Sequence, residues 1–180
     1  MSDIAARTIW LTGLPCSGKS TLAAAVGQRL AAMGQVARVL DGDDLRRGLA
    51  SDLGFAPRDR TENIRRTAEV ARLFNEVGIP VIAALVSPSR DDREMARRIV
   101  GPARFVEVYL SAPLDVCERR DTKGMYARAR RGEIREFTGV DAPYEAPLAP
   151  AVAIDSGILS LDLSVERVLS AAAAQASDTD

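Results

Sequence analysis

Short apolar runs alternate with longer amphipathic segments along the 180-residue chain. The short runs favour strands, and the longer segments carry apolar residues at helical spacing. The predicted strands cover residues 8–12, 36–40, 81–86, 105–110 and 151–154. The predicted helices cover residues 21–33, 60–77, 90–100, 114–120 and 165–174. This alternation predicts an α/β fold with a doubly wound parallel sheet, built as a single domain over residues 1–180.

Residues 121–139 interrupt this alternation. The segment reads DTKGMYARARRGEIREFTG, is dominated by charged residues and glycines, and offers too few apolar side chains for a core element. We predict a mobile lid that brings cations over an anionic ligand; the alternative is a solvated charged helix with loose ends. Residues 175–180 are expected to form a disordered tail.

The composition excludes several classes of protein. Hydrophobic residues make up 47% and charged residues 27%, which is typical of a folded globular domain. The 24 basic and 25 acidic residues nearly cancel, so we expect no nucleic-acid partner. No apolar run is long enough to span a membrane, residues 1–7 show no secretory signal, and two cysteines cannot form a disulfide framework. We therefore expect a cytoplasmic protein without a membrane partner.

The chain contains no histidine, which excludes Ser-His-Asp and Cys-His triads and histidine-ligated metals. Any acid–base chemistry therefore falls to carboxylates, to lysine or to the substrate itself. Only Lys19 and Lys123 are lysines; all other basic residues are arginines. Because both lysines lie within the motifs described below, we infer that a compact ammonium group is needed at these positions.

A phosphate-binding loop joins the first predicted strand to the first predicted helix. Residues 13–20 read GLPCSGKS and fit the pattern G-x-x-x-x-G-K-[ST]. In this pattern the backbone N–H groups point inward around phosphate oxygens, and the helix dipole adds to the attraction. Lys19 would reach the β- and γ-phosphates, and the Ser20 hydroxyl would bind Mg²⁺. The loop predicts a nucleoside triphosphate site; we interpret Cys16 as a small filler and not as a reactive thiol.

The other motifs favour a small-molecule kinase over a GTPase switch or an ATP-driven motor. The chain has no Asn/Thr-Lys-x-Asp box for guanine and no apolar strand that ends in Asp-Glu. The second strand ends instead in Asp41-Gly42-Asp43, at the sheet edge where ligands bind in such folds. Asp43 can hold Mg²⁺ or accept the proton of an acceptor hydroxyl during in-line phosphoryl transfer. The alternative is a polar turn that uses Asp and Gly for backbone reasons.

Arginines gather after the second strand and indicate an anionic acceptor. Arg46, Arg60, Arg65 and Arg66 lie there, with Asn63 among them. Arg60 and Asn63 are one helical turn apart and share a face. Arginine forks suit phosphate or sulfate oxygens. For Arg65 we favour a solvated helix face paired with a neighbouring glutamate.

Two of the four phenylalanines, Phe55 and Phe137, lie in polar loop segments. A phenylalanine in a loop more often packs down on the core. Two of them beside arginine-rich stretches can instead stack on a planar base.

Six motifs in order resemble the adenylyl-sulfate kinase (APS kinase) family. They read GLPCSGKST, DGDDLRRGL, DLGFAPRDRTENIRR, VSPSR, VEVYLSAPLDVCERRDTKGMY and FTGVDAPYEAP, and they span about residues 8 to 150. The resemblance implies a P-loop kinase fold with a mobile lid. It also implies transfer of the γ-phosphoryl group of ATP to the 3′-hydroxyl of adenosine 5′-phosphosulfate (APS), which yields 3′-phosphoadenosine 5′-phosphosulfate and ADP in sulfate assimilation.

The resemblance also implies roles for individual residues. The residues implied to hold ATP are Gly13, Leu14, Pro15, Cys16, Ser17, Gly18, Lys19, Ser20 and Thr21. Those implied to bind APS are Asp43, Arg46, Phe55, Arg60, Asn63, Val86, Ser87, Lys123, Phe137 and Thr138. Ser20 and Asp43 would hold Mg²⁺, partly through water. The implied catalytic residues are Asp43, Lys19 and Ser87.

Family descriptions often mark the serine at Ser87 as a phosphoserine intermediate. In-line transfer needs no covalent carrier, and nothing nearby in the sequence would activate this hydroxyl. We therefore favour a positioning role for Ser87.

The chain departs from the family pattern at several positions. Asp44 stands where the family usually has Asn, Ser89 replaces an aromatic residue, and Pro15 and Cys16 replace small residues. The longer N-terminal extension common in bacterial members is also missing from this sequence. The family further implies a homodimer and functional coupling to ATP sulfurylase. Two alternatives stay open: a related P-loop kinase with another acceptor, and a non-catalytic nucleotide-binding subunit.

Overall fold

The computed structural model describes residues 6–177 and contains a five-stranded sheet in the order β2-β3-β1-β4-β5. All four strand pairings are parallel, which confirms the predicted doubly wound α/β fold. The strands are β1 (Thr8–Gly13), β2 (Arg38–Asp41), β3 (Val81–Ala84), β4 (Phe105–Leu110) and β5 (Val152–Ile154).

The helices are α1 (Lys19–Ala32), α2 (Gly42–Arg47), α3 (Pro57–Glu76), α4 (Arg90–Val100), α5 (Leu114–Arg119), α6 (Met125–Arg130) and α7 (Leu161–Ser177). The five predicted helices are present, α4 with the predicted ends and the other four with shifted ends, whereas α2 and α6 are not among the predicted helices. The tail was expected from residue 175, yet α7 includes residues 175–177, and the remaining residues 178–180 lie outside the described residues. No helix within residues 6–177 combines the length and apolar character needed to cross a membrane.

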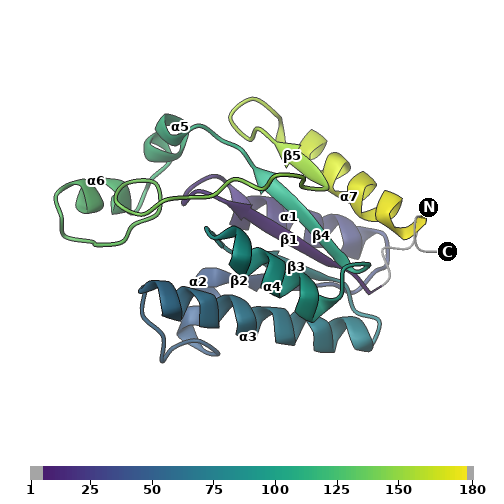
Figure 1. Ribbon diagram of the computed structural model, residues 1–180. Helices are drawn as coiled ribbons and strands as arrows, with labels where there is room; N and C mark the ends of the chain where they lie inside the picture. The colour runs from purple at the N-terminus through teal and green to yellow at the C-terminus, as the bar shows by residue number, and fades with distance from the viewer. Residues whose placement is uncertain (1–5, 178–180) are drawn as a thin grey trace.

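Helices cover both faces of the sheet (Figure 1). Helices α1 and α7 pack on one face, where Ile9, Leu11 and Val26 are buried together. Helices α3 and α4 pack on the other face against Trp10. Because successive side chains of a strand point to opposite faces, β1 contributes to both cores, and all of its residues are buried.

The carboxyl ends of the central strands meet at one edge. Strand β3 ends at Ala84, two residues earlier than predicted, because the Val86 carbonyl accepts a hydrogen bond of 2.8 Å from the Thr12 hydroxyl. Ser87 then turns the chain with a φ of 38°. Parallel pairing places the ends of β1, β2 and β3 side by side, so the segments that follow them share one site.

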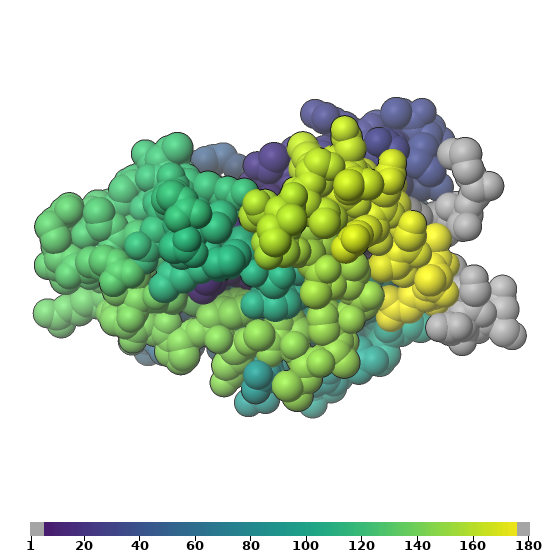
Figure 2. Space-filling view, turned by 90° about the horizontal axis from the view of Figure 1, so that it is seen from above, coloured from purple at the N-terminus to yellow at the C-terminus, as the bar shows by residue number. Residues whose placement is uncertain are grey.

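The predicted lid, residues 121–139, has a small core of its own. Tyr126, Ala129 and Phe137 are buried there against Ala112 and Cys117. Our expectation that the segment has too few apolar residues for a core was wrong, because residues flanking it complete the cluster. Figure 2 shows this region in green as a lobe at the opposite end of the molecule from α7, drawn in yellow.

Candidate active site

The phosphate-binding loop leaves β1 at Gly13 and enters α1 after Gly18. A Cβ atom on Gly13 would lie 2.6 Å from the Leu110 carbonyl oxygen, and its φ of 151° also disfavours any other residue. Gly18, with a φ of 96°, precedes the first turn of α1. Only glycine fits at these two places, so the loop can curl back against the start of the helix.

Lys19 is buried at the centre of this loop, with 8% of its surface exposed. Its Nζ donates hydrogen bonds of 2.9 Å to the Gly13 carbonyl, 2.6 Å to the Leu14 carbonyl and 3.3 Å to Ser17 Oγ. Burial lowers the pKa of Lys19 to about 8, because the charged form loses its hydration. A triphosphate would supply the anionic partner that this ammonium group lacks.

Two acidic residues at the end of β2 have different partners. Ser20 Oγ donates a hydrogen bond of 2.6 Å to Asp41 Oδ2, whereas Asp43 Oδ2 lies 2.6 Å from Lys123 Nζ of the lid. Asp41 also caps α2, because its other carboxylate oxygen accepts from the Asp43 N–H at 2.9 Å. The Asp43 carboxylate raises the pKa of Lys123. Asp41 was not among the predicted site residues, although its position at a strand end beside Gly42 was a usable signal.

The donors at Ser20, Asp41 and Asp43 are those that Mg²⁺ accepts. Magnesium prefers oxygen ligands and is commonly bound through one or two carboxylates together with substrate phosphates and water. Within residues 6–177, no group of three or more histidine, cysteine, aspartate or glutamate side chains is placed to hold a metal ion. The hydroxyl and carboxylates beside the phosphate-binding loop fit an ion that shares its ligands with a nucleotide.

Arg46 and Phe55 form the first part of a second region. The Arg46 guanidinium lies over the Phe55 ring, 4.3 Å from its centroid, and donates a hydrogen bond of 2.7 Å to the Gly54 carbonyl. Partial burial lowers the pKa of Arg46. The Phe55 side chain is 58% exposed and is therefore open to contact with a planar ligand.

Arg60 joins α3 to the lid. Its guanidinium donates to the carbonyls of Phe55 at 2.8 Å and Glu136 at 2.5 Å, and to Thr138 Oγ1 at 2.8 Å. Burial lowers the pKa of this guanidinium. Asn63, one turn further along α3, is buried, and its Oδ1 has no hydrogen-bond partner within residues 6–177. A buried acceptor without a partner is costly, so this oxygen is suited to a ligand donor.

The other predicted aromatic and basic residues divide between lid and surface. Phe137 is buried in the lid, where its ring meets Tyr126 edge-on with centroids 5.0 Å apart. Arg65 pairs with Glu62 on an exposed face of α3, as expected. Arg66 pairs with both Glu62 and Asp52, so this guanidinium already has carboxylate partners.

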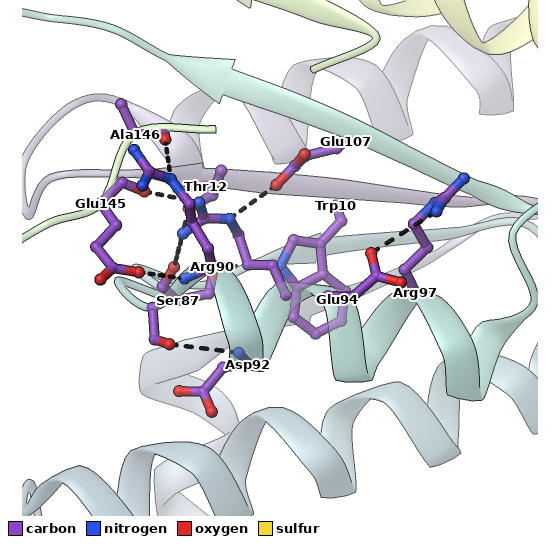
Figure 3. Close-up of polar contacts among 12 residues, drawn as sticks. Trp10, Thr12, Ser87, Arg90, Asp92, Glu94, Arg97, Glu107, Glu145 and Ala146 are labelled. Carbon is purple, nitrogen blue, oxygen red and sulfur yellow. Dashed lines mark hydrogen bonds and ion pairs between the residues drawn. The ribbon is translucent and has the colours of Figure 1, made fainter. Parts of the chain in front are cut away.

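Ser87, at the turn after β3, is buried. Its Oγ accepts a hydrogen bond of 3.1 Å from the Trp10 indole and lies 3.4 Å from the Leu85 carbonyl, to which it can donate. The Ser87 carbonyl accepts a hydrogen bond of 2.6 Å from Arg93. Figure 3 shows Ser87 among Trp10, Thr12 and Glu145. These contacts hold the side chain and the carbonyl of Ser87 in place.

A cavity of about 530 Å³ adjoins the phosphate-binding loop and the start of α1. Besides residues of the loop and α1, it is lined by Arg120, Ser156 and Leu159. Arg120 donates a hydrogen bond of 2.7 Å to the Ser156 carbonyl, and Ser156 Oγ donates one of 2.6 Å to the Ser17 carbonyl. Sequence reasoning missed Arg120 and Ser156, because no local motif links two residues this far apart in the chain.

The fold and this loop define a P-loop kinase. A model of the adenylylsulphate kinase family matches residues 5–155, and the chain belongs to that family. An adenylyl-sulfate kinase of Bacteroides fragilis is 56% identical over 161 residues, which cover 89% of this chain and 80% of the relative. One of Paraburkholderia xenovorans is 56% identical over 169 residues, 94% of each chain.

A solved structure gives the same result. The Mycobacterium tuberculosis APS kinase CysC in complex with AMPPNP and APS superposes with a TM-score of 0.88 at 44% identity, over 92% of this chain and 96% of that one. A gluconokinase of Sinorhizobium meliloti, with a TM-score of 0.67 over 96% of this chain and 94% of the other but only 20% identity, shares the fold alone.

The buried ammonium group predicts a pH-dependent stability. Between pH 8 and 10.5 the folded protein releases the Lys19 proton before the unfolded chain does, so the free energy of unfolding should rise with pH through this window. Lys19→Met should remove up to about 3 kcal/mol of this rise. Urea denaturation at several pH values measures it.

The second lysine provides the matched control. Lys123 is exposed and its pKa is shifted upward, so Lys123→Met should leave the rise between pH 8 and 10.5 intact. Equal pH dependence in the wild type and Lys19→Met would contradict the assignment to Lys19.

Proposed function

We propose that the protein transfers the γ-phosphoryl group of ATP to the 3′-hydroxyl of APS and releases 3′-phosphoadenosine 5′-phosphosulfate and ADP. One observation carries this proposal: two ligand regions meet at the carboxyl edge of the sheet, in a chain whose solved relative holds AMPPNP and APS together. One region surrounds Lys19, and the other is formed by Arg46, Phe55, Arg60 and Asn63. Asp43 belongs to the segment between them.

ATP binding would use the phosphate-binding loop and the adjoining cavity. Residues 13–21 would hold the phosphates through their backbone N–H groups, with Lys19 exchanging its carbonyl partners for phosphate oxygens. The cavity lined by Arg120, Ser156 and Leu159 would hold the nucleoside, because it opens beside the loop at Gly18. The Arg120 guanidinium is suited to stacking on the adenine ring.

Mg²⁺ would be held by Ser20, Asp41 and Asp43, partly through water. When bound, the ion neutralises charge on the β- and γ-phosphates. Ser20 lies at the start of α1 and Asp41 at the end of β2, and the hydrogen bond between them shows that both side chains reach the same point. Because of this contact, we add Asp41 to the residues that we propose to bind the metal ion.

APS binding would use Phe55 and Arg46 for the planar and anionic parts of the ligand. The exposed Phe55 ring can stack on adenine, while Arg46 and Arg60 offer guanidinium forks for phosphate and sulfate oxygens. Asn63 Oδ1 can accept from the adenine amino group, which would satisfy this buried atom. Val86, Ser87, Phe137 and Thr138 would line the pocket and its lid, although Phe137 would have to leave its packing on Tyr126 to stack.

Asp43 would accept the proton of the 3′-hydroxyl as that oxygen attacks the γ-phosphorus. No histidine is present to do so. Lys123 is ion-paired with the Asp43 carboxylate at 2.6 Å and would give up this partner to the acceptor hydroxyl. The bond from the γ-phosphorus to the oxygen that bridges the β- and γ-phosphates would break, and ADP would leave with that oxygen.

The wider setting follows from the family. We propose a role in sulfate assimilation in the cytoplasm, a homodimeric assembly, and functional coupling to ATP sulfurylase. The family resemblance alone supports these proposals.

An acceptor panel tests the proposed function. Purified protein with ATP and Mg²⁺ should release ADP when APS is added, in a coupled assay. Stimulation by a sugar acid or another small alcohol but not by APS would assign a related kinase. Binding of both ATP and APS without product would indicate a non-catalytic nucleotide-binding subunit.

Asp43→Asn should reduce turnover far more than binding. We expect kcat to fall at least about a hundredfold while the Kd values for ATP and APS change less than about threefold, because the proton acceptor is lost. Asp44→Asn is the matched control, since this neighbour is exposed and its one ion pair within residues 6–177 is with Arg47. Steady-state kinetics and calorimetry measure both; a retained kcat in Asp43→Asn would refute the role.

Ser87→Ala should keep kcat within about tenfold of the wild type, because loss of a covalent nucleophile would cost orders of magnitude more. The buried Oγ is bonded to Trp10, and no base adjoins it among the described contacts. Intact-mass measurement after incubation with ATP should find no phosphoserine at Ser87. Complete loss of activity with intact binding of both substrates would instead support a phosphoserine intermediate at Ser87.

A further inference from the structure

Helix α4 carries a buried arginine that the proposed chemistry does not use. The Arg93 side chain is only 3% exposed. Its Nε donates a hydrogen bond of 2.7 Å to Glu107 Oε1, and its two terminal nitrogens donate bonds of 2.6 Å each to the carbonyls of Ser87 and Glu145. One guanidinium thus joins α4 to β4 and to two loop segments that are far apart in the chain.

The two carbonyls belong to two separate segments, one that follows a strand and one that follows the lid. Ser87 lies at the turn after β3, here called the floor because we propose that Ser87 lines the APS pocket. Glu145 lies in residues 143–147, here called the strap, which connects the end of the lid to β5. Figure 3 shows Ser87, Glu107 and Glu145 converging on one point, with Glu107 on the rigid strand β4.

Further contacts make the floor and the strap one unit. The Glu145 N–H donates to the Pro88 carbonyl at 2.9 Å, and the Glu145 side chain accepts from the Arg90 N–H at 2.7 Å. The Tyr144 hydroxyl is hydrogen-bonded to Thr12 Oγ1 at 2.9 Å. In this network, the Arg93 side chain contacts the floor at Ser87, the strap at Glu145 and strand β4 at Glu107.

The floor needs such support because Ser87 is a non-glycine residue with a φ of 38°. A left-handed conformation costs about 1 kcal/mol for an ordinary residue and persists only where the surroundings fix it. The Ser87 carbonyl accepts from Arg93 at 2.6 Å and from Thr12 at 3.3 Å, and both bonds hold this peptide in its orientation.

We propose that Arg93 is a positioning residue for the acceptor substrate: it sets the distance between the pocket floor at Ser87 and the strap that anchors the lid. The inference rests on the proposed function. Charge pairing with Glu107 alone would not require the two terminal nitrogens to meet the carbonyls of Ser87 and Glu145. A planar guanidinium meets the three partners with three separate nitrogens in a fixed fork, whereas a lysine ammonium gathers its three donors on one nitrogen.

Arg93→Lys tests the proposal, because it keeps the positive charge beside Glu107 and removes the fork. We expect the KM for APS to rise about tenfold, as for loss of one charged hydrogen bond, while kcat and the KM for ATP stay within about twofold. Hydrogen exchange at the strap amides should become faster. Arg97→Lys is the matched control, since this arginine lies on the same helix and, in the described part of the chain, forms its one ion pair with Glu94 at 3.7 Å.

A second variant guards against loss of folding. Arg93→Gln combined with Glu107→Gln removes both charges together, leaves no unpaired buried ion, and should raise the KM for APS in the same selective way. Two results would overturn the inference: equal rises in the KM for APS and the KM for ATP, or a lower melting temperature with an unchanged KM for APS. Either result would mean that Arg93 forms only a structural ion pair. An inactive wild type would overturn the proposed function and this inference with it. An active wild type with unaltered variants would overturn this inference alone.

Discussion

The parallel pairing of β1 with both β3 and β4 is the constraint on which the rest of the structure depends. Its register places Thr8 opposite Val81 on one side and opposite Phe105 on the other. All three strands therefore end at the same edge, and the chain leaves the sheet there at Gly13, near Ser87 and after Leu110. The close approach of Gly13 to the Leu110 carbonyl is a direct result of this pairing. Without it, the loop around Lys19 would have no fixed wall.

The sequence was sufficient to predict the elements whose signal is local. The apolar strands, the long helices and the phosphate-binding loop were found because periodicity and a short motif determine them. Helices α2 and α6 were missed because each is only six residues long and begins in a polar segment. The lid core was missed for a different reason: Tyr126 and Phe137 are buried by Ala112 and Cys117, which lie outside the segment that we analysed as a lid.

Side-chain partners were the least predictable feature. Asp41 and Asp43 flank the same glycine, and only the start of α2 decides that Asp41 faces Ser20 while Asp43 faces Lys123. The partners of the arginines were equally hard to predict from the sequence. Arg65 and Arg93 are alike in the sequence, yet one forms an exposed ion pair of a kind that contributes little to stability, and the other is a buried three-way contact. Burial, which composition cannot give, distinguishes them.

The same difference in burial separates the contacts that hold the lid. The ion pair between Lys123 and Asp43 is about two-thirds exposed on both sides, so breaking it costs about 1 kcal/mol or less. Arg60 holds Thr138 through a partly buried charged hydrogen bond, which contributes about 1.5–3 kcal/mol, and also donates an exposed one to the Glu136 carbonyl. Asp43 can therefore exchange Lys123 for another partner at little cost while the far end of the lid stays attached to α3. The weaker contact thus lies at the carboxylate for which we propose the proton transfer, and the stronger contact lies at the residues that we propose to line the acceptor pocket.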